Sequence, residues 1–146
     1  SGMKKNNSGF TLVETAAVAA ILGMLLALLL PQASQLLRGA RRAAAVSDAR
    51  ATAQAVQMYL DDVREEGNLT MRTLHALMGS QLGDPEGPLA GYLSGGLSDA
   101  RIVSVDVDLQ TGVLEEMLYE NEDTQVKLVL EEGGLLTARE IADREP

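Results

Sequence analysis

Apolar positions dominate the chain from Phe10 to Leu30, where only Thr11, Glu14 and Thr15 are polar. A helix of these 21 residues rises about 30 Å, which is the thickness of the hydrocarbon core of a bilayer. The pattern therefore predicts a membrane-spanning helix. Glu14 is its unusual residue, because a carboxylate inside a membrane span needs a partner for its charge.

From Gln32 to Glu66 apolar positions recur at steps of three and four residues, which is typical of a helix with one buried face. Gly67 and Asn68 supply a stop signal directly after this stretch. We expect the helix to cover a globular domain with its apolar stripe. The predicted stripe consists of Val46, Ala49, Ala53, Val56, Leu60 and Val63.

A short second helix is predicted from Met71 to Met78, with Thr70 as its N-cap and Gly79 at its end. The residues 79–96 that follow are rich in Gly and Pro, which indicates a loop.

The C-terminal part alternates between apolar and polar residues, as β-strands do. The first strand is predicted from Arg101 to Leu109, and two more over residues 113–119 and 126–130. A turn with Gly112 in a positive-φ conformation is expected after the first strand. In that strand the buried face is predicted to carry Val103, Val105, Val107 and Leu109, and the solvent face Ser104, Asp106 and Asp108.

Residues 135–143 are consistent with two structures. Leu135 and Leu136 favour a short fourth strand, whereas Thr137 with Glu140 fits the capping box of a C-terminal helix. The sequence leaves both open. In either case the predicted fold class is α+β: a long N-terminal α-helix, transmembrane in its first half, packed on a small antiparallel β-sheet of three to four strands.

Charge divides the chain into a basic and an acidic part. Residues 1–60 have a net charge of +4, and residues 61–146 have a net charge of −13. Nucleic-acid binding needs Lys and Arg to neutralise phosphates, so we expect no direct nucleic-acid contact from the acidic domain. Arg38, Arg41 and Arg42 are placed to meet acidic groups of neighbouring molecules or lipid phosphates, or to form a solvated collar.

The composition gives no sign of catalysis. His75 is the single histidine and has no nucleophile or second ligand near it in the sequence, while alternation places Asp106 and Asp108 on a solvent face. We therefore expect a protein that is not an enzyme and uses no cofactor. The chain has no cysteine, no tryptophan and few aromatic residues, so its core is predicted to consist of aliphatic residues and Met.

The N-terminus resembles the signal of type IV prepilins and pseudopilins. Lys4 and Lys5 form a short basic leader, and Ser8 and Gly9 precede the run Phe10-Thr11-Leu12-Val13-Glu14. In that family a membrane peptidase cuts after the glycine and methylates the new terminus. The resemblance implies cleavage after Gly9 and methylation of Phe10.

The same resemblance implies roles for three further residues. The family's glutamate, here Glu14, is thought to neutralise the amino terminus of a neighbouring subunit during assembly. Gly23 and Pro31 fall where many members have a glycine and a proline, and where the helix bends or melts in filaments. Both residues weaken a helix by themselves, since proline lacks an N–H group and glycine has a poor helix propensity.

The resemblance also implies a set of partners and a location. The chain is expected to form a homopolymeric helical filament after contact with a prepilin peptidase, an inner-membrane assembly platform with its ATPase, and membrane lipid. It would cross the cytoplasmic membrane once, with the leader inside, and become a periplasmic or extracellular filament. The alternatives are a major pseudopilin of a type II secretion or competence system, and a membrane-anchored extracytoplasmic binding module without an assembly role.

The expected organisation has four parts. Residues 1–9 are the leader, of which residues 1–2 look like a cloning remnant; residues 10–31 form the membrane-spanning and filament-core helix; residues 32–66 pack on the domain; and residues 67–146 form the loop region and sheet. Because some major pseudopilins bind calcium in a C-terminal loop, Asp84, Glu86 and Asp99 are weak calcium candidates, without EF-hand spacing.

Overall fold

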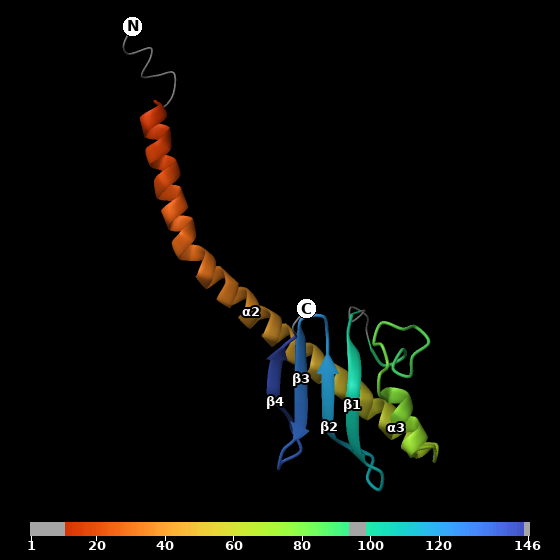
Figure 1. The fold of residues 1–146 in the computed structure, drawn as a ribbon. Coiled ribbons are helices and arrows are strands. Elements are labelled where there is room, and N and C mark those ends of the chain that lie inside the picture. Colours follow the sequence, from red (N-terminus) through yellow and green to blue (C-terminus); the bar gives the residue numbers. More distant parts are fainter. Residues whose placement is uncertain (1–10, 94–98, 145–146) are drawn as a thin grey trace. The chain divides into compact units, whose positions relative to one another are not determined.

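A computed structural model describes residues 11–93 and 99–144 of the chain. It divides the chain into two compact units, residues 1–39 and residues 40–146. The described elements are α2 (Leu12–Glu65), α3 (Met71–Leu77), β1 (Arg101–Asp108), β2 (Val113–Glu120), β3 (Thr124–Leu130) and β4 (Leu136–Asp143) (Figure 1). The prediction of an α+β fold with one long N-terminal helix and an antiparallel sheet is confirmed.

The end of α2 is the stop that the sequence predicted. Gly67 has a φ of 78°, which a residue without a side chain adopts at no steric cost. The N–H of Asn68 donates to the carbonyl of Val63 at 2.8 Å, and that of Gly67 to the carbonyl of Arg64 at 3.0 Å. These two bonds form a Schellman motif, which satisfies the last carbonyls of the helix.

The four strands form one antiparallel sheet in the order β1-β2-β3-β4, so each strand pairs with its neighbour in sequence. The structure decides the open question at the C-terminus, because β4 pairs with β3 from Leu136 opposite Leu130 to Asp143 opposite Thr124. Strand pairing thus prevails over the capping box that Thr137 and Glu140 suggested. The helix α3 ends at Leu77, one residue before the predicted end.

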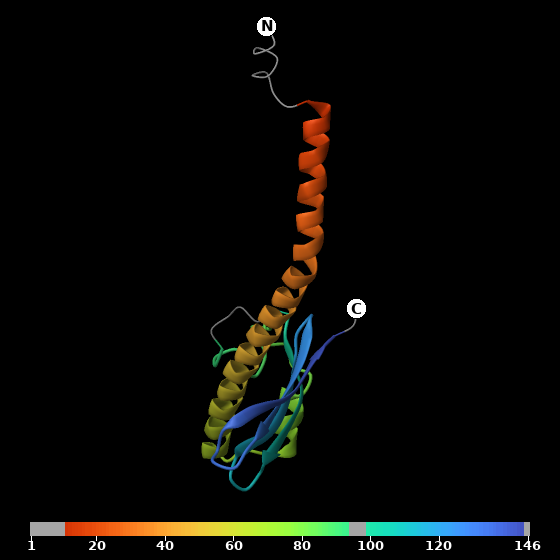
Figure 2. The ribbon, with the colours of Figure 1, turned by 90° about the vertical axis from the view of Figure 1, so that its left-hand side faces the viewer.

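The core lies between the sheet and the part of α2 that belongs to the domain, and Figure 2 shows these as two layers. Of the predicted stripe, Ala49, Ala53, Val56 and Leu60 are buried, while Val46 and Val63 are half-buried at its two ends. The sheet contributes Ile102, Leu114, Met117, Tyr119, Val126 and Leu128.

The prediction of a purely aliphatic and Met core was wrong at one position. Tyr119, on β2, is the largest of the fully buried side chains. Burial, followed by the nearby charge of Asp48, raises the pKa of its phenol to about 12, although a hydrogen bond with Asn121 opposes the shift. The ring belongs to the same core cluster as the buried alanines of α2, and burial by a facing helix cannot be seen in the pattern of a single strand.

The first strand also differs from its prediction. The sequence placed Val103 on the buried face with Val105 and Val107, but Ile102 is buried instead and Val103 is half-buried. The pairing of β1 with β2 shifts between Ile102 and Ser104, and this irregularity moves the alternation by one residue. Leu109 lies beyond the strand and is exposed.

Among the described residues of the domain one carboxylate is buried, and its contacts join β1, β2, β3 and the residue after β4. Glu120 on β2 is paired with Arg101 of β1 at 3.0 Å and with Arg144 at 3.4 Å, and it accepts a hydrogen bond from Gln125 of β3. The bond from Gln125, followed by the two arginines, lowers the pKa of Glu120 against the opposing effect of burial. The carboxylate therefore stays ionised well below neutral pH.

Candidate assembly site in the N-terminal helix

The N-terminal end of α2 is built by Thr11. The hydroxyl oxygen of Thr11 accepts the backbone N–H of Glu14 at 3.1 Å, and its carbonyl accepts the N–H of Thr15 at 2.9 Å. Thr11 is therefore the N-cap of the helix, and Glu14 occupies the third helical position. The sequence Thr11-x-x-Glu14 is the pattern of a capping box.

The cap determines where the charge of Glu14 lies. Glu14 is in the first turn of α2 and is exposed in the single chain. A carboxylate at this end of a helix is favoured by the partial positive charge of the free N–H groups, by about 0.3–1 kcal/mol. Because Thr11 stands directly before the first helical residue, the site presents one carboxylate one turn into an apolar helix.

The sequence analysis singled out Glu14 but missed Thr11, which it counted only as a polar interruption. The signal was available, since Thr or Ser three residues before Glu, at the start of an apolar run, marks a helix N-terminus. Two other predicted residues of this site, Gly9 and Phe10, lie outside the described residues, so cleavage and methylation remain predictions.

Gly23 and Pro31 both lie inside α2. The helix continues through Pro31, although this residue cannot donate a hydrogen bond to the carbonyl of Ala27. A Cβ atom built on Gly23 would meet nothing within 4 Å, so space does not require a glycine there. Bending at these two residues stays a prediction, and the helix assignment shows that Pro31 does not end the helix.

The surface of this helical segment is apolar and uncovered. An 18-residue window of α2 near the N-terminus has a mean hydropathy of 2.3, and none of it is buried. By length and composition this helix is able to cross a membrane. The large exposed side chains of the segment are Leu12, Val13, Val18, Ile21, Leu22, Met24, Leu25, Leu26, Leu28, Leu29, Leu30, Leu36 and Leu37.

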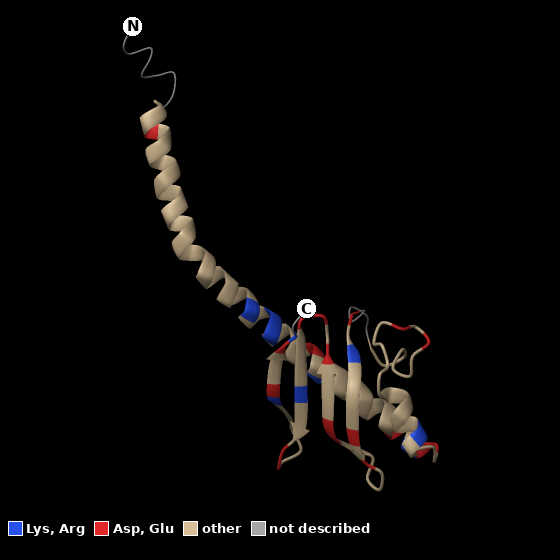
Figure 3. Ribbon diagram, viewed as in Figure 1, with Lys and Arg blue, Asp and Glu red and all other residues tan. Residues whose placement is uncertain are grey.

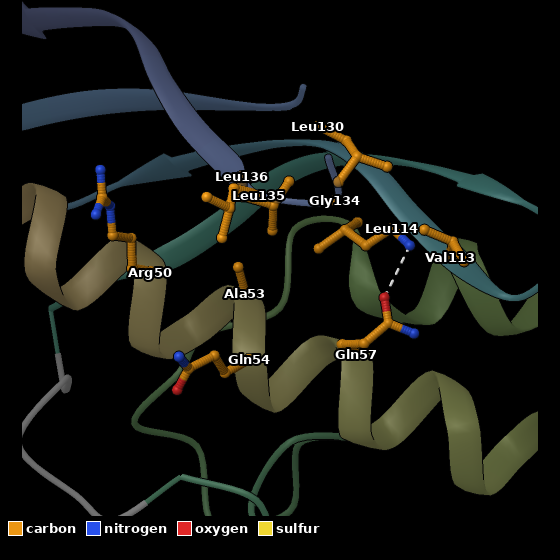
Figure 4. A pocket seen from close by; sticks show the side chains of 10 residues that line it. All are labelled: Arg50, Ala53, Gln54, Gln57, Val113, Leu114, Leu130, Gly134, Leu135 and Leu136. Atoms are coloured by element: carbon orange, nitrogen blue, oxygen red, sulfur yellow. Dashed lines mark hydrogen bonds between the residues drawn. The ribbon is translucent and has the colours of Figure 1, made fainter. Parts of the chain in front are cut away.

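The second half of α2 is fixed to the sheet by polar contacts as well as by the core. Gln57 donates to the carbonyl of Gly112 and accepts a hydrogen bond from the N–H of Leu114, both at 2.9 Å. Its side-chain amide thus satisfies two backbone groups at the start of β2, and Figure 4 shows the bond to Leu114. Arg64 donates to the carbonyl of Gln110 at 3.2 Å. Gly112 has a φ of 74°, and a Cβ atom there would lie 2.7 Å from the side chain of Arg64. The turn between β1 and β2 thus fits closely against the helix.

Charges within the domain are unevenly placed. Figure 3 shows Lys and Arg on a short stretch of α2 and at single places on β1, β3 and α3, while Asp and Glu are spread over the strands and turns. Arg42 pairs with Asp143 at the end of β4, at 3.0 Å, and the hydrogen bond and charge of Asp143 raise the pKa of Arg42. This arginine therefore has an acidic partner within its own chain, whereas Arg41 lies exposed on the same helix.

The loop before β1 is held to α2 by Tyr92. Its hydroxyl donates to Asp62 at 2.5 Å, and its ring meets that of Tyr59 edge to face, with centroids 5.7 Å apart. The bond to Asp62, followed by desolvation, raises the pKa of Tyr92 to about 12.

The calcium candidates do not form a recognisable metal site. The carboxylate of Asp84 accepts the N–H of Glu86 at 2.9 Å, which stabilises a local turn. Among the described residues, no three His, Cys, Asp or Glu side chains gather where they would hold a metal ion. Asp106 is exposed, and Asp108 accepts N–H groups of the β1–β2 turn.

Comparisons with known proteins bear on this N-terminal site. Residues 4–30 match the family model of the prokaryotic N-terminal methylation motif. The chain is also similar to the type II secretion system core protein G of Pseudomonas aeruginosa, with 37% identity over 84 residues. That alignment covers 57% of this chain and 58% of the relative. No solved structure matches the chain significantly.

Proposed function

We propose that the chain is a structural subunit of a type IV pilus-like or type II secretion filament. The resemblance to type IV pilins and pseudopilins, which both comparisons support, is the basis of this proposal. The observation that carries the proposal is the methylation motif over residues 4–30, within which the long helix α2 begins at Leu12 with an uncovered apolar surface. Its role is assembly rather than catalysis.

Processing would place a new amino terminus close to Glu14. Cleavage after Gly9 leaves Phe10 and Thr11 in front of the first helical residue, Leu12. The methylated amine of Phe10 is a cation, and a carboxylate one turn along an apolar helix is a natural counter-charge in a low-dielectric environment. The helix dipole alone is too weak to repay burial of the carboxylate, which favours the amine of a neighbouring copy as the partner of Glu14.

Gly23 and Pro31 would let the packed helix yield between them. Glycine lowers helix stability by about 1 kcal/mol relative to alanine. Proline leaves one carbonyl without its intrahelical donor. Since a Cβ atom fits at Gly23 without contact, replacing this glycine by alanine tests stiffness rather than steric fit.

The apolar segment has two successive environments in this proposal. Before assembly its side chains contact lipid as a single span of the cytoplasmic membrane, and afterwards they contact other copies in a filament on the periplasmic or extracellular side. The prepilin peptidase, the assembly platform and its ATPase are the partners that this route requires.

The similarity to core protein G of a type II secretion system favours the pseudopilin form of the proposal. A major pilus subunit would be abundant in filaments sheared from cells, whereas a pseudopilin would be needed for protein secretion and be scarce in that fraction. A membrane-anchored binding module, the candidate from a different class, would keep its leader.

The test is the N-terminal sequence and intact mass of the full chain produced with a prepilin peptidase. We expect a chain that begins at methylated Phe10, and an unprocessed chain when the peptidase is inactive. A chain that retains Met3 to Gly9 beside a peptidase that cuts a control prepilin would contradict the proposal and favour the anchored binding module.

A further inference from the structure

The outer strand of the sheet, β4, borders two hollows that open between it and α2. One, of about 350 Å³, is lined by the start of β4 and by Gln57 and Ala53 of the helix (Figure 4). The other, of about 440 Å³, lies toward the end of β4. Within the described residues β4 pairs only with β3, so its outer edge and both hollows are open to contact.

The second hollow, which we call the Arg42–Arg50 hollow, combines an apolar floor with a cationic rim. It is lined by Arg42, Ala43, Val46, Ser47, Arg50 and Ile141. Ile141 lines the open hollow, and its side chain is 38% exposed. Arg42 is paired with Asp143, but Arg50 has no ion-pair partner among the described residues. The hollow therefore suits an apolar side chain that is accompanied by a carboxylate.

The turn between β3 and β4 carries such a pair. Gly133 and Gly134 both have positive φ, and the N–H of Glu131 donates to the carbonyl of Leu135 at 2.9 Å, so the turn is tight. Leu135 is 75% exposed, more than any other large apolar side chain described in residues 40–144. Glu132 beside it is exposed and has no ion-pair partner among the described residues, whereas Glu131 is paired with Arg139.

We propose that the β3–β4 turn of one copy docks into the Arg42–Arg50 hollow of the next, with Leu135 on the apolar floor and Glu132 beside Arg50. The turn directly precedes β4, whereas Ile141 of the Arg42–Arg50 hollow lies near the end of β4, so each copy offers one turn and one hollow. Arg50 lies between them, because it also lines the first hollow together with Leu135. A contact between two different surfaces repeats from copy to copy and builds a filament instead of a closed dimer. This inference rests on the proposed function and identifies the domain surface that a filament uses.

The experiment exploits the absence of cysteine from the chain. A full-length variant with both Ala43→Cys and Leu135→Cys is produced with the peptidase and assembly machinery, and mild oxidation follows. Docking predicts a ladder of disulfide-linked multimers, because each copy joins the next through one pair. A matched variant with Ala43→Cys and Met71→Cys, whose second thiol replaces an exposed residue at the start of α3, is expected to give no ladder.

A charge exchange between Arg50 and Glu132 tests the same contact in the double-cysteine chain. Arg50→Glu in the double-cysteine chain is expected to reduce the ladder roughly fivefold, and adding Glu132→Arg to restore it. Arg72→Glu, an equal charge change at an exposed position of α3, serves as the control and is expected to leave the ladder unchanged.

The outcomes separate this inference from the proposed function. A ladder together with sheared filaments supports both. Filaments without a ladder, when both thiols react with a maleimide, would overturn the docking and leave the filament role intact. A single dimer band would indicate a symmetric contact between copies and would also overturn it. Absence of processing and filaments would refute the proposed function, and the docking with it.

Discussion

The two parts of α2 have the same secondary structure and opposite surroundings. Between Leu12 and Gly39 every described side chain is exposed, and most are apolar. Between Ala45 and Leu60 seven side chains are buried against the domain's own core. Helix formation is therefore no guide to what stabilises each part. The second part is buried against the domain, whereas the apolar surface of the first has no cover within the described residues.

The largest expected difference concerns assembly. Glu14→Ala removes one charge of the proposed ion pair and leaves the other without compensation, which predicts at least about a hundredfold loss of filaments in the sheared fraction. Thermal unfolding of the domain should not change, because Glu14 lies outside residues 40–146. We expect processing after Gly9 to be largely retained. Glu65→Ala, which removes one carboxylate at the other end of α2, is the control. Normal filament yield from Glu14→Ala would exclude this role.

A core substitution acts on the other part of the helix. Leu60 is fully buried, and Leu60→Ala is expected to lower the free energy of unfolding of the domain by about 3 kcal/mol through lost burial and a cavity. The matched change Leu25→Ala, in the uncovered segment, should leave that value unchanged. Denaturant unfolding of the detergent-solubilised chain measures both, and equal effects would contradict the division into two parts.

The polar link between α2 and the sheet is expected to have a smaller effect. Gln57→Ala leaves the N–H of Leu114 and the carbonyl of Gly112 without their partner, which predicts a loss of about 2 kcal/mol. Amide hydrogen exchange is the sharper measurement, since Leu114 should lose protection before the rest of β2. Unchanged protection at Leu114 would show that water replaces the amide without cost.

The smallest predicted effect depends on pH. The pKa of Glu120 is lowered in the folded domain, so its contribution to stability is present above the pKa of the unfolded chain and is lost as the pH falls through the folded value. Glu120→Gln should therefore cost about 1 kcal/mol at neutral pH and make the decline of stability in acid shallower. Unfolding curves at pH 7 and near pH 3 test this, and parallel curves for both proteins would contradict it.

The parts of the fold that follow from local pattern were predicted from the sequence. The stop at Gly67, the stripe through Ala49, Ala53, Val56 and Leu60, and three strands were all readable, because periodicity and turn residues act over a few positions. The choice of strand for residues 136–143 was not readable, since it depends on pairing with β3, which a single segment does not reveal.

The N-terminal site could be predicted from local sequence, whereas two features of the core could not. The residues that resemble a known signal, such as Glu14, were found by their pattern. Thr11 was missed although its capping pattern is local. The displaced alternation at Ile102 and the buried ring of Tyr119 depend on the partner strand and the facing helix, and no reading of their own segments would have shown them.

The positions of the tyrosines decide what an optical experiment on this protein reports. The chain has no tryptophan, and its three tyrosines, Tyr59, Tyr92 and Tyr119, all lie in residues 40–146. Ultraviolet absorbance and near-ultraviolet dichroism from tyrosine therefore follow the domain and are blind to the apolar helical segment. Since Tyr92 and Tyr119 have pKa values of about 12, tyrosinate absorbance from these residues near pH 10 would signal an opened domain.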